Sequence, residues 1–76
     1  MDPIPLSNFK IQDKGIVTSI DDNELMVAFL EMGILEGTAI ELVHIAPLGD
    51  PIAIMIGSYT LTLRKSEAAH IWMNKL

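Results

Sequence analysis

Two histidines, His44 and His70, are the side chains best suited to bind a metal or to move a proton. They lie 26 positions apart, and the chain has no Cys that could join them as a ligand. A metal site built from both histidines and a carboxylate stays open, since ligands far apart in sequence can converge in a fold. We favour a simpler interpretation, with His44 a partly buried strand residue and His70 a surface residue near the end of a helix.

No arrangement of nucleophile and base is recognisable in the chain. None of the four serines has a Gly-x-Ser-x-Gly setting, and the five glycines are isolated, so no phosphate-binding loop is expected. Ser66 is better explained as the N-terminal cap of a short helical turn. A single Arg64 at the end of a strand is too little for an arginine finger. The sequence therefore predicts that the protein is not an enzyme.

The least ordinary stretch is the loop of residues 46–51, which reads Ala-Pro-Leu-Gly-Asp-Pro. Pro47 and Pro51 restrict the backbone and cannot donate hydrogen bonds to a sheet. Asp50 could be a ligand, but the commoner use is to bond its own backbone in a turn. Leu48, at the tip, either projects towards a partner or folds back onto the protein, and the sequence leaves both open.

Composition limits the partners that the chain can have. Its 76 residues carry a net charge of −5, and the five basic residues are scattered, which argues against nucleic acid and against an anionic membrane surface. The N-terminus resembles no signal peptide and no run is long enough to cross a bilayer, so we expect a soluble cytoplasmic protein. Half of the residues are hydrophobic, which predicts that some apolar side chains stay exposed, either as a contiguous contact patch or as scattered single residues, and also allows self-association.

Apolar periodicity and turn residues predict the elements. Alternating or β-branched runs favour strands at residues 15–20, 39–45, 52–56, 59–63 and 71–73. A helix is expected over residues 23–32, with Asp21 or Asp22 as its cap and Gly33 at its C-terminal end. Residues 1–5 are expected to be a flexible lead-in, and residues 74–76 a tail. The result is a mainly β fold, a small SH3-like five-stranded barrel with one inserted α-helix and a short C-terminal helical turn, forming a single domain over residues 1–76.

Two of these strands carry predictions about which side chains share a face. In the strand of residues 39–45, His44 is placed on the same side as Ile40 and Leu42. In the strand of residues 59–63, Tyr59 is placed inside with Leu61 and Leu63. The Gly57-Ser58 pair between two strands is typical of a type II′ hairpin turn.

Three blocks of the sequence are distinctive when taken together. They are Leu30-Glu-Met-Gly-Ile-Leu-Glu-Gly-Thr38, Ala46-Pro-Leu-Gly-Asp-Pro51 and Leu61-Thr-Leu-Arg-Lys-Ser-Glu-Ala68. In this order and spacing they resemble the FeoA family of small cytoplasmic proteins of bacterial ferrous iron uptake. The resemblance implies an SH3-like barrel with an inserted helix and no enzymatic activity. It also implies that the chain binds the membrane iron permease FeoB, which carries a cytosolic GTP-binding domain, and supports its transport of iron(II). Recruitment to the inner face of the membrane would then depend on that partner.

We therefore predict a partner-binding site in two parts and no resident cofactor. The expected contact residues are Met26, Leu30, Pro47, Leu48, Gly49, Asp50 and Pro51. The alternative is a metal-sensing SH3-like module that binds a transition metal through His44, His70 and carboxylates, and weak transition-metal binding is left open.

Overall fold

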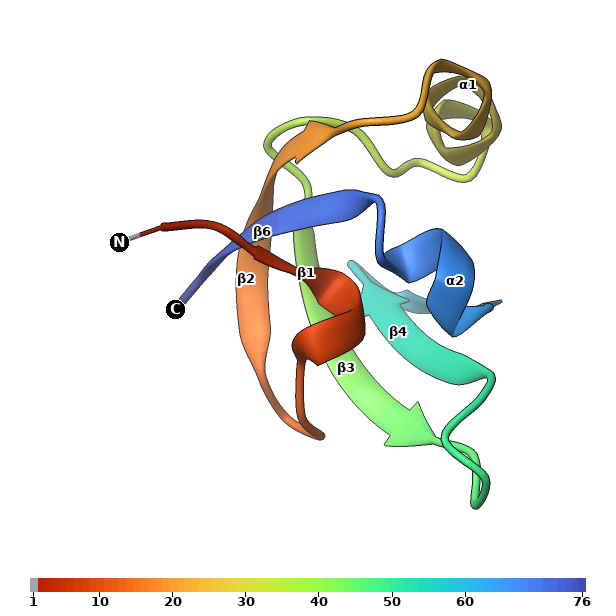
Figure 1. Ribbon diagram of the computed structural model, residues 1–76. Coiled ribbons are helices and arrows are strands. Elements are labelled where there is room, and N and C mark those ends of the chain that lie inside the picture. The colour runs from red at the N-terminus through yellow and green to blue at the C-terminus, as the bar shows by residue number, and fades with distance from the viewer. Residues whose placement is uncertain (1) are drawn as a thin grey trace.

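The computed structural model describes residues 2–76, and its strands form one six-stranded sheet (Figure 1). The elements in chain order are β1 (Ile4–Pro5), a 3-10 turn η1 (Leu6–Asn8), β2 (Lys14–Ile20), α1 (Asn23–Glu31), β3 (Ala39–Ile45), β4 (Ile52–Ile56), β5 (Tyr59–Leu63), α2 (Lys65–Ala68) and β6 (Ile71–Lys75). The order across the sheet is β1-β6-β2-β3-β4-β5, and every neighbouring pair is antiparallel. The mainly β SH3-like fold with an inserted helix is confirmed.

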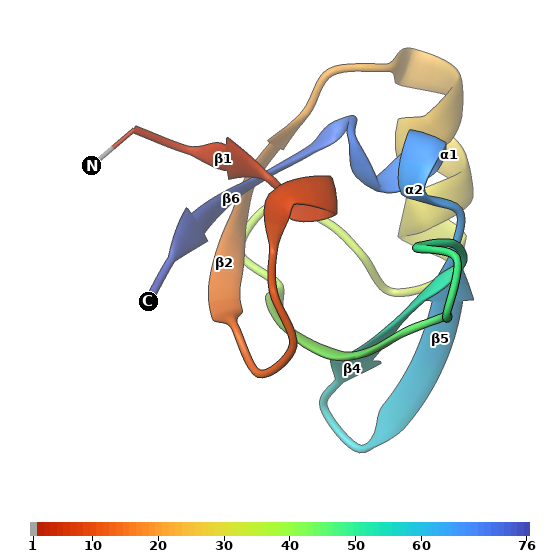
Figure 2. The same cartoon turned by 60° about the horizontal axis from the view of Figure 1, so that its bottom comes forward.

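The sheet curves around an interior, as the view in Figure 2 shows, and one cluster of buried hydrophobic residues fills it. Side chains alternate across the strands, so every second residue of β4, and of the first part of β2 and β3, reaches this interior. The buried hydrophobic residues are Leu6, Phe9, Val17, Ile20, Phe29, Ile34, Ile40, Leu42, Ile52, Ile54, Ile56, Leu63, Ala68, Ile71 and Met73. Most of them come from the strands, while α1 contributes only Phe29. The helix therefore keeps most of its apolar side chains near the surface.

Helix α1 begins and ends where the sequence predicted, within one residue. The Leu25 N–H donates to Asp22 Oδ1 at 2.9 Å, which confirms Asp22 as the N-terminal cap, and Glu24 lies in the first turn. At the other end, Gly33 adopts a φ of +87°, a left-handed conformation that favours glycine. The helix is held at both ends even though it is only nine residues long.

Strand β1 was not predicted, because residues 4 and 5 were assigned to a flexible lead-in. Ile4 pairs with Met73 and Pro5 pairs with Trp72 on β6. Ile4 is partly buried against the core, and Pro5 lies in an edge strand, where a missing N–H is tolerated. The sheet consequently has six strands rather than five, and its two edges are β1 and β5. Strand β6 also runs longer than predicted, since Asn74 pairs with Ile16 and Lys75 with Gly15.

The prediction that His44 is partly buried on the same side of the strand as Ile40 and Leu42 is wrong, because the pairing register of β3 with β4 shifts between Leu42 and His44. Leu42 pairs with Ile54 and His44 with Ala53, so two steps along β3 match one step along β4. Such a bulge reverses the alternation of the residues that follow it. His44 is exposed as a result, and Ile45 packs against the core in its place.

Two further side chains differ from the sequence prediction. Tyr59 is half exposed rather than internal, and its hydroxyl donates to the Met32 carbonyl oxygen at 2.6 Å. Ser66 does not cap α2, since the Glu67 carboxylate instead accepts from the Arg64 N–H at 3.0 Å. The two-residue turn at Gly57-Ser58 is confirmed, because Ile56 pairs with Tyr59 and Gly57 has a φ of +58°.

Candidate partner-binding surfaces

The loop 46–51 connects β3 to β4 and holds Leu48 away from the rest of the protein. The Leu48 residue is 98% exposed, so of the two interpretations that the sequence left open, the outward one applies. Two backbone hydrogen bonds close the loop, from Gly49 N to Ala46 O at 2.7 Å and from Ala46 N to Pro51 O at 3.0 Å. Gly49 has a φ of +92°, which its lack of a Cβ allows. The loop is therefore closed on itself and presents one large apolar side chain to solvent.

Asp50 attaches the same loop to helix α2. Its Oδ1 accepts the Lys65 N–H at 2.9 Å, so it does not bond its own turn as the sequence suggested. The β4–β5 hairpin explains this contact, because Ile52 pairs with Leu63 and the chain returns beside Asp50 after β5. The carboxylate satisfies a free amide in the first turn of α2, where negative charge is favoured. The contact fixes the base of the loop without using Leu48.

A second surface is a groove beside α1, with a volume of about 240 Å³. The α1 groove is lined by Ser19, Ile20, Met26, Leu30, Ile34, Leu35 and Glu36. Met26, Leu30 and Leu35 are 43%, 57% and 48% exposed, which is high for large apolar side chains. Val27 next to them is 61% exposed. The groove and Val27 make one of the exposed apolar patches that typically mark contact surfaces.

The predicted contact residues therefore fall into two separate surfaces. Met26 and Leu30 line the α1 groove, whereas residues 47–51 form the loop. The connection from α1 enters β3 at Ala39, and the loop leaves it at Ile45. The seven residues of β3 span six steps of about 3.3 Å, which places the two surfaces about 20 Å apart along the strand. Figure 1 shows α1 and the β3–β4 loop at opposite ends of the molecule.

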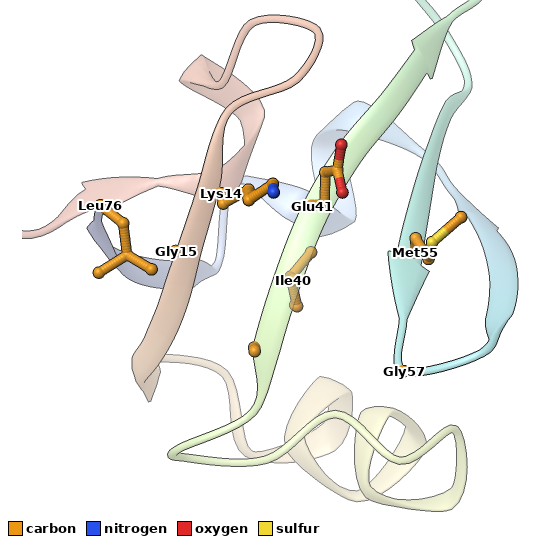
Figure 3. Close-up of a pocket in the computed structure, with 8 residues that line it drawn as sticks. Lys14, Gly15, Ile40, Glu41, Met55, Gly57 and Leu76 are labelled. Carbon is orange, nitrogen blue, oxygen red and sulfur yellow. The ribbon is translucent and has the colours of Figure 1, made fainter.

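A shallower hollow of about 210 Å³ lies on the outside of the sheet and was not predicted (Figure 3). It is lined by Lys14, Gly15, Ala39, Ile40, Glu41, Met55, Gly57 and Leu76, from β2, β3, β4, the turn after β4 and the C-terminal residue. Leu76 reaches it because its N–H donates to the Lys14 carbonyl oxygen at 2.8 Å. Its charged side chains are one Lys and one Glu, which is too few convergent polar groups to suggest chemistry.

Asp21 joins two residues that the sequence places about fifty positions away. Trp72 Nε1 donates to Asp21 Oδ2 at 2.8 Å, and His70 Nδ1 lies 2.6 Å from Asp21 Oδ1. The hydrogen bond from Trp72 and then the contact with His70 lower the pKa of the Asp21 carboxyl. Strands β2 and β6 bring the three residues together, since Ile20 pairs with Ile71. No local pattern in the sequence could have indicated this cluster.

The metal alternative required His44 and His70 to converge with carboxylates. Within residues 2–76, no group of three or more His, Cys, Asp or Glu side chains is arranged to hold a metal ion. His70 contacts one carboxylate, and His44 is exposed on β3. The donor set that the structure describes does not fit a closed metal site, which needs several convergent ligands.

The structure is a small SH3-like β domain with an exposed apolar loop tip and an exposed apolar groove. Comparison with known families makes the assignment more specific, because the FeoA domain matches residues 4–75. The chain belongs to the FeoA family, as the three blocks of sequence had indicated.

Similar proteins agree with this assignment. The solved FeoA-like protein from Clostridium acetobutylicum is 38% identical, with a TM-score of 0.92 over 100% of this chain and 90% of that one. The zinc complex of FeoA from Stenotrophomonas maltophilia, described as a prokaryotic SH3 domain protein, has a TM-score of 0.81 over 93% of this chain and 89% of that one. At 24% identity, it supports the fold alone.

A curated relative joins two functions in one polypeptide. It is the Fe(2+) transport protein A/Fe(2+) transporter FeoB fusion protein of Porphyromonas gingivalis, 33% identical over 67 residues. The match covers 87% of this chain but only 8% of that relative's length. In the part of this chain that the structure describes, no helix is both long and apolar enough to cross a membrane.

Proposed function

We propose that this chain is a non-enzymatic accessory protein of ferrous iron uptake that binds the cytosolic part of a FeoB-type permease and supports its transport of iron(II). The observation that carries the proposal is the fusion relative, in which a domain similar to this chain is covalently joined to such a transporter. Fusion of two modules gives each a high effective concentration at the other, which is useful when the two act together. A separate chain would have to achieve the same association by non-covalent contacts.

The loop 46–51 is the first contact surface in this proposal. Leu48 is almost fully exposed, and the bonds of Gly49 and Asp50 hold the backbone around it. A loop ordered before binding loses little conformational entropy when it docks, so one apolar side chain can contribute strongly. Pro47 and Pro51 add to this ordering by restricting their own φ angles.

The α1 groove, through Met26 and Leu30, is the second contact surface. Two surfaces about 20 Å apart suit a partner that is larger than this single domain of residues 1–76. In the proposal the domain works in the cytoplasm and reaches the inner face of the membrane only through its partner. This agrees with the net charge of −5, which disfavours direct attraction to anionic lipids.

Retention on a purified FeoB-type permease tests the proposal. The permease is immobilised in detergent, and wild-type chain, Leu48→Asp and Leu76→Asp are passed over it. Leu76 is the matched control, because it is also a largely exposed leucine, at 79%, and lies outside both proposed surfaces. Wild type and Leu76→Asp should be retained and Leu48→Asp should be lost, with equal circular dichroism for all three. Absence of wild-type retention would exclude direct binding, and retention of Leu48→Asp would exclude the loop.

A further inference from the structure

The exposed side of α1 is an apolar band bordered by acidic residues. Successive residues of an α-helix are separated by about 100°, so Met26, Leu30 and Val27 follow one another around the helix. Glu31 and Glu24 come next on the side of Val27. On the other side of the band, Glu36 itself lines the groove. Apolar side chains therefore occupy the centre of this face, with carboxylates on both borders.

The border carboxylates are not neutralised by the surrounding protein. The segment from Gly15 to Leu63 contains Asp21, Asp22, Glu24, Glu31, Glu36, Glu41 and Asp50 but no Lys or Arg. Glu24, Glu31 and Glu36 are exposed, and across residues 2–76 the salt bridges are those of Asp21 with His70 and of Asp13 with Lys75. An unpaired acidic border favours a partner of opposite charge and repels a negative one.

The volume of the groove and the charge of its border distinguish between the ligands that it could bind. Its volume of about 240 Å³ is below the roughly 300–1,000 Å³ of typical small-molecule sites, but suits an apolar side chain from a docking segment. The acidic border disfavours an anionic membrane, and it also disfavours the same face of a second copy, whose net charge is −5.

We propose that the α1 groove binds a cationic amphipathic segment of a protein partner, with an apolar anchor in the groove and Lys or Arg against the acidic border. This inference rests on the proposed function for the identity of the partner, but its chemistry is testable separately. The face is ordered before binding, because Asp22 caps the start of α1 and Tyr59 bonds the Met32 carbonyl oxygen at its end. Apolar anchors at helical spacing would supply affinity, and the charges would supply specificity and orientation.

Fluorescence anisotropy with synthetic peptides tests the inference. The probe carries Leu at positions i, i+3, i+4 and i+7 and Lys at the other positions, so that one helical face is apolar. One control peptide has the same composition in an order that scatters Leu around the helix, and the other has Glu in place of Lys. The protein variants are Met26→Gln with its control Met55→Gln, and Glu36→Gln with its control Glu41→Gln. Met26 and Met55 are matched in exposure at 43% and 39%, and the second of each pair lies outside the groove.

The probe should bind in a salt-dependent way, and both control peptides should bind at least tenfold more weakly. Met26→Gln should weaken binding by about tenfold and Glu36→Gln by about two- to fivefold, whereas Met55→Gln and Glu41→Gln should match wild type. Equal affinity for the scattered peptide, or equal affinity of Met26→Gln and Met55→Gln, would overturn the inference. A dimer in sedimentation that Met26→Gln abolishes would overturn it in favour of a second copy.

Competition on the permease separates this inference from the proposed function. If wild-type chain is retained and neither excess probe nor Met26→Gln reduces retention, the groove inference fails while permease binding stands. If the chain is not retained but binds the probe through Met26, the proposed function fails and the groove inference stands. Loss of retention with both probe and Met26→Gln supports the two together.

Discussion

The hydrogen bond from the Tyr59 hydroxyl to the Met32 carbonyl oxygen joins the C-terminal end of α1 to β5, and substitutions at Gly33 and Tyr59 can measure its contribution to stability. A Cβ added at Gly33 would lie 2.5 Å from the Tyr59 hydroxyl oxygen, so the tyrosine would have to move. Movement would break its 2.6 Å hydrogen bond to the Met32 carbonyl oxygen. Gly33 also has a φ of +87°, which any L-residue with a Cβ adopts at a cost.

The expected magnitudes follow from these two effects. Gly33→Ala should lower the free energy of unfolding by about 1–2 kcal/mol for the left-handed backbone. The lost hydrogen bond adds about 0.5–1.5 kcal/mol, which gives a total of about 1.5–3.5 kcal/mol. Tyr59→Phe alone should cost about 0.5–1.5 kcal/mol, since it removes the same bond. The double variant should then be no less stable than Gly33→Ala, because the bond can be lost only once.

Urea denaturation of wild type, both single variants and the double variant provides the test. The coupling energy between the two sites should equal the cost of Tyr59→Phe, about 0.5–1.5 kcal/mol. In thermal melts of a domain of this size, each kcal/mol corresponds to a shift of about 4–8 °C in Tm. Strictly additive costs would refute the reasoning, since they would mean that Gly33→Ala leaves the tyrosine contact intact.

Three further predictions concern other parts of the structure. Gly15→Ala should lower the free energy of unfolding by about 1–3 kcal/mol, because the added Cβ would lie 2.8 Å from the Asn74 carbonyl oxygen. An unchanged midpoint of urea denaturation would contradict the close approach of β2 and β6 at this position. The fold lowers the pKa of the Asp21 carboxyl, so this group stabilises the protein when it is ionised, at pH values above the usual aspartate pKa of about 4. The contribution is lost as the pH falls through the lowered pKa. Asp21→Asn should accordingly be less stable at neutral pH and lose less stability than wild type on acidification, and parallel pH profiles would contradict the assignment. Calorimetry with iron(II), manganese(II) and zinc(II) should show weak binding at most, whereas tight stoichiometric binding lost in His44→Ala would favour metal sensing.

The regular elements could be predicted because their signals are local. Strand alternation depends on residues two positions apart, and the ends of α1 depend on Asp22 and Gly33, which act within a few residues of their own position. The hairpin at Gly57-Ser58 is equally local. These features needed no knowledge of which strands are neighbours.

The predictions that were wrong concern features that depend on a neighbouring strand. The bulge that exposes His44 arises from the pairing register of β3 with β4. The hydrogen bond of Asp50 depends on the position of Lys65, which follows β5. The cluster of Asp21 with Trp72 exists only because β2 and β6 are neighbours. The loop 46–51 and the apolar residues of α1 could be singled out from the sequence as candidates, but their separation into two surfaces required the fold.

In the proposed function, this chain supports iron(II) transport by contacting a FeoB-type permease through its exposed loop. Uptake of radiolabelled iron(II) by cells that contain the permease but lack this chain tests it most directly, after complementation with equal amounts of wild type, Leu48→Asp or Leu76→Asp. Wild type and Leu76→Asp should restore uptake, and Leu48→Asp should not. Full restoration by Leu48→Asp would contradict the role of the loop, and uptake unchanged by the wild-type chain would contradict the proposal that this chain supports iron(II) transport.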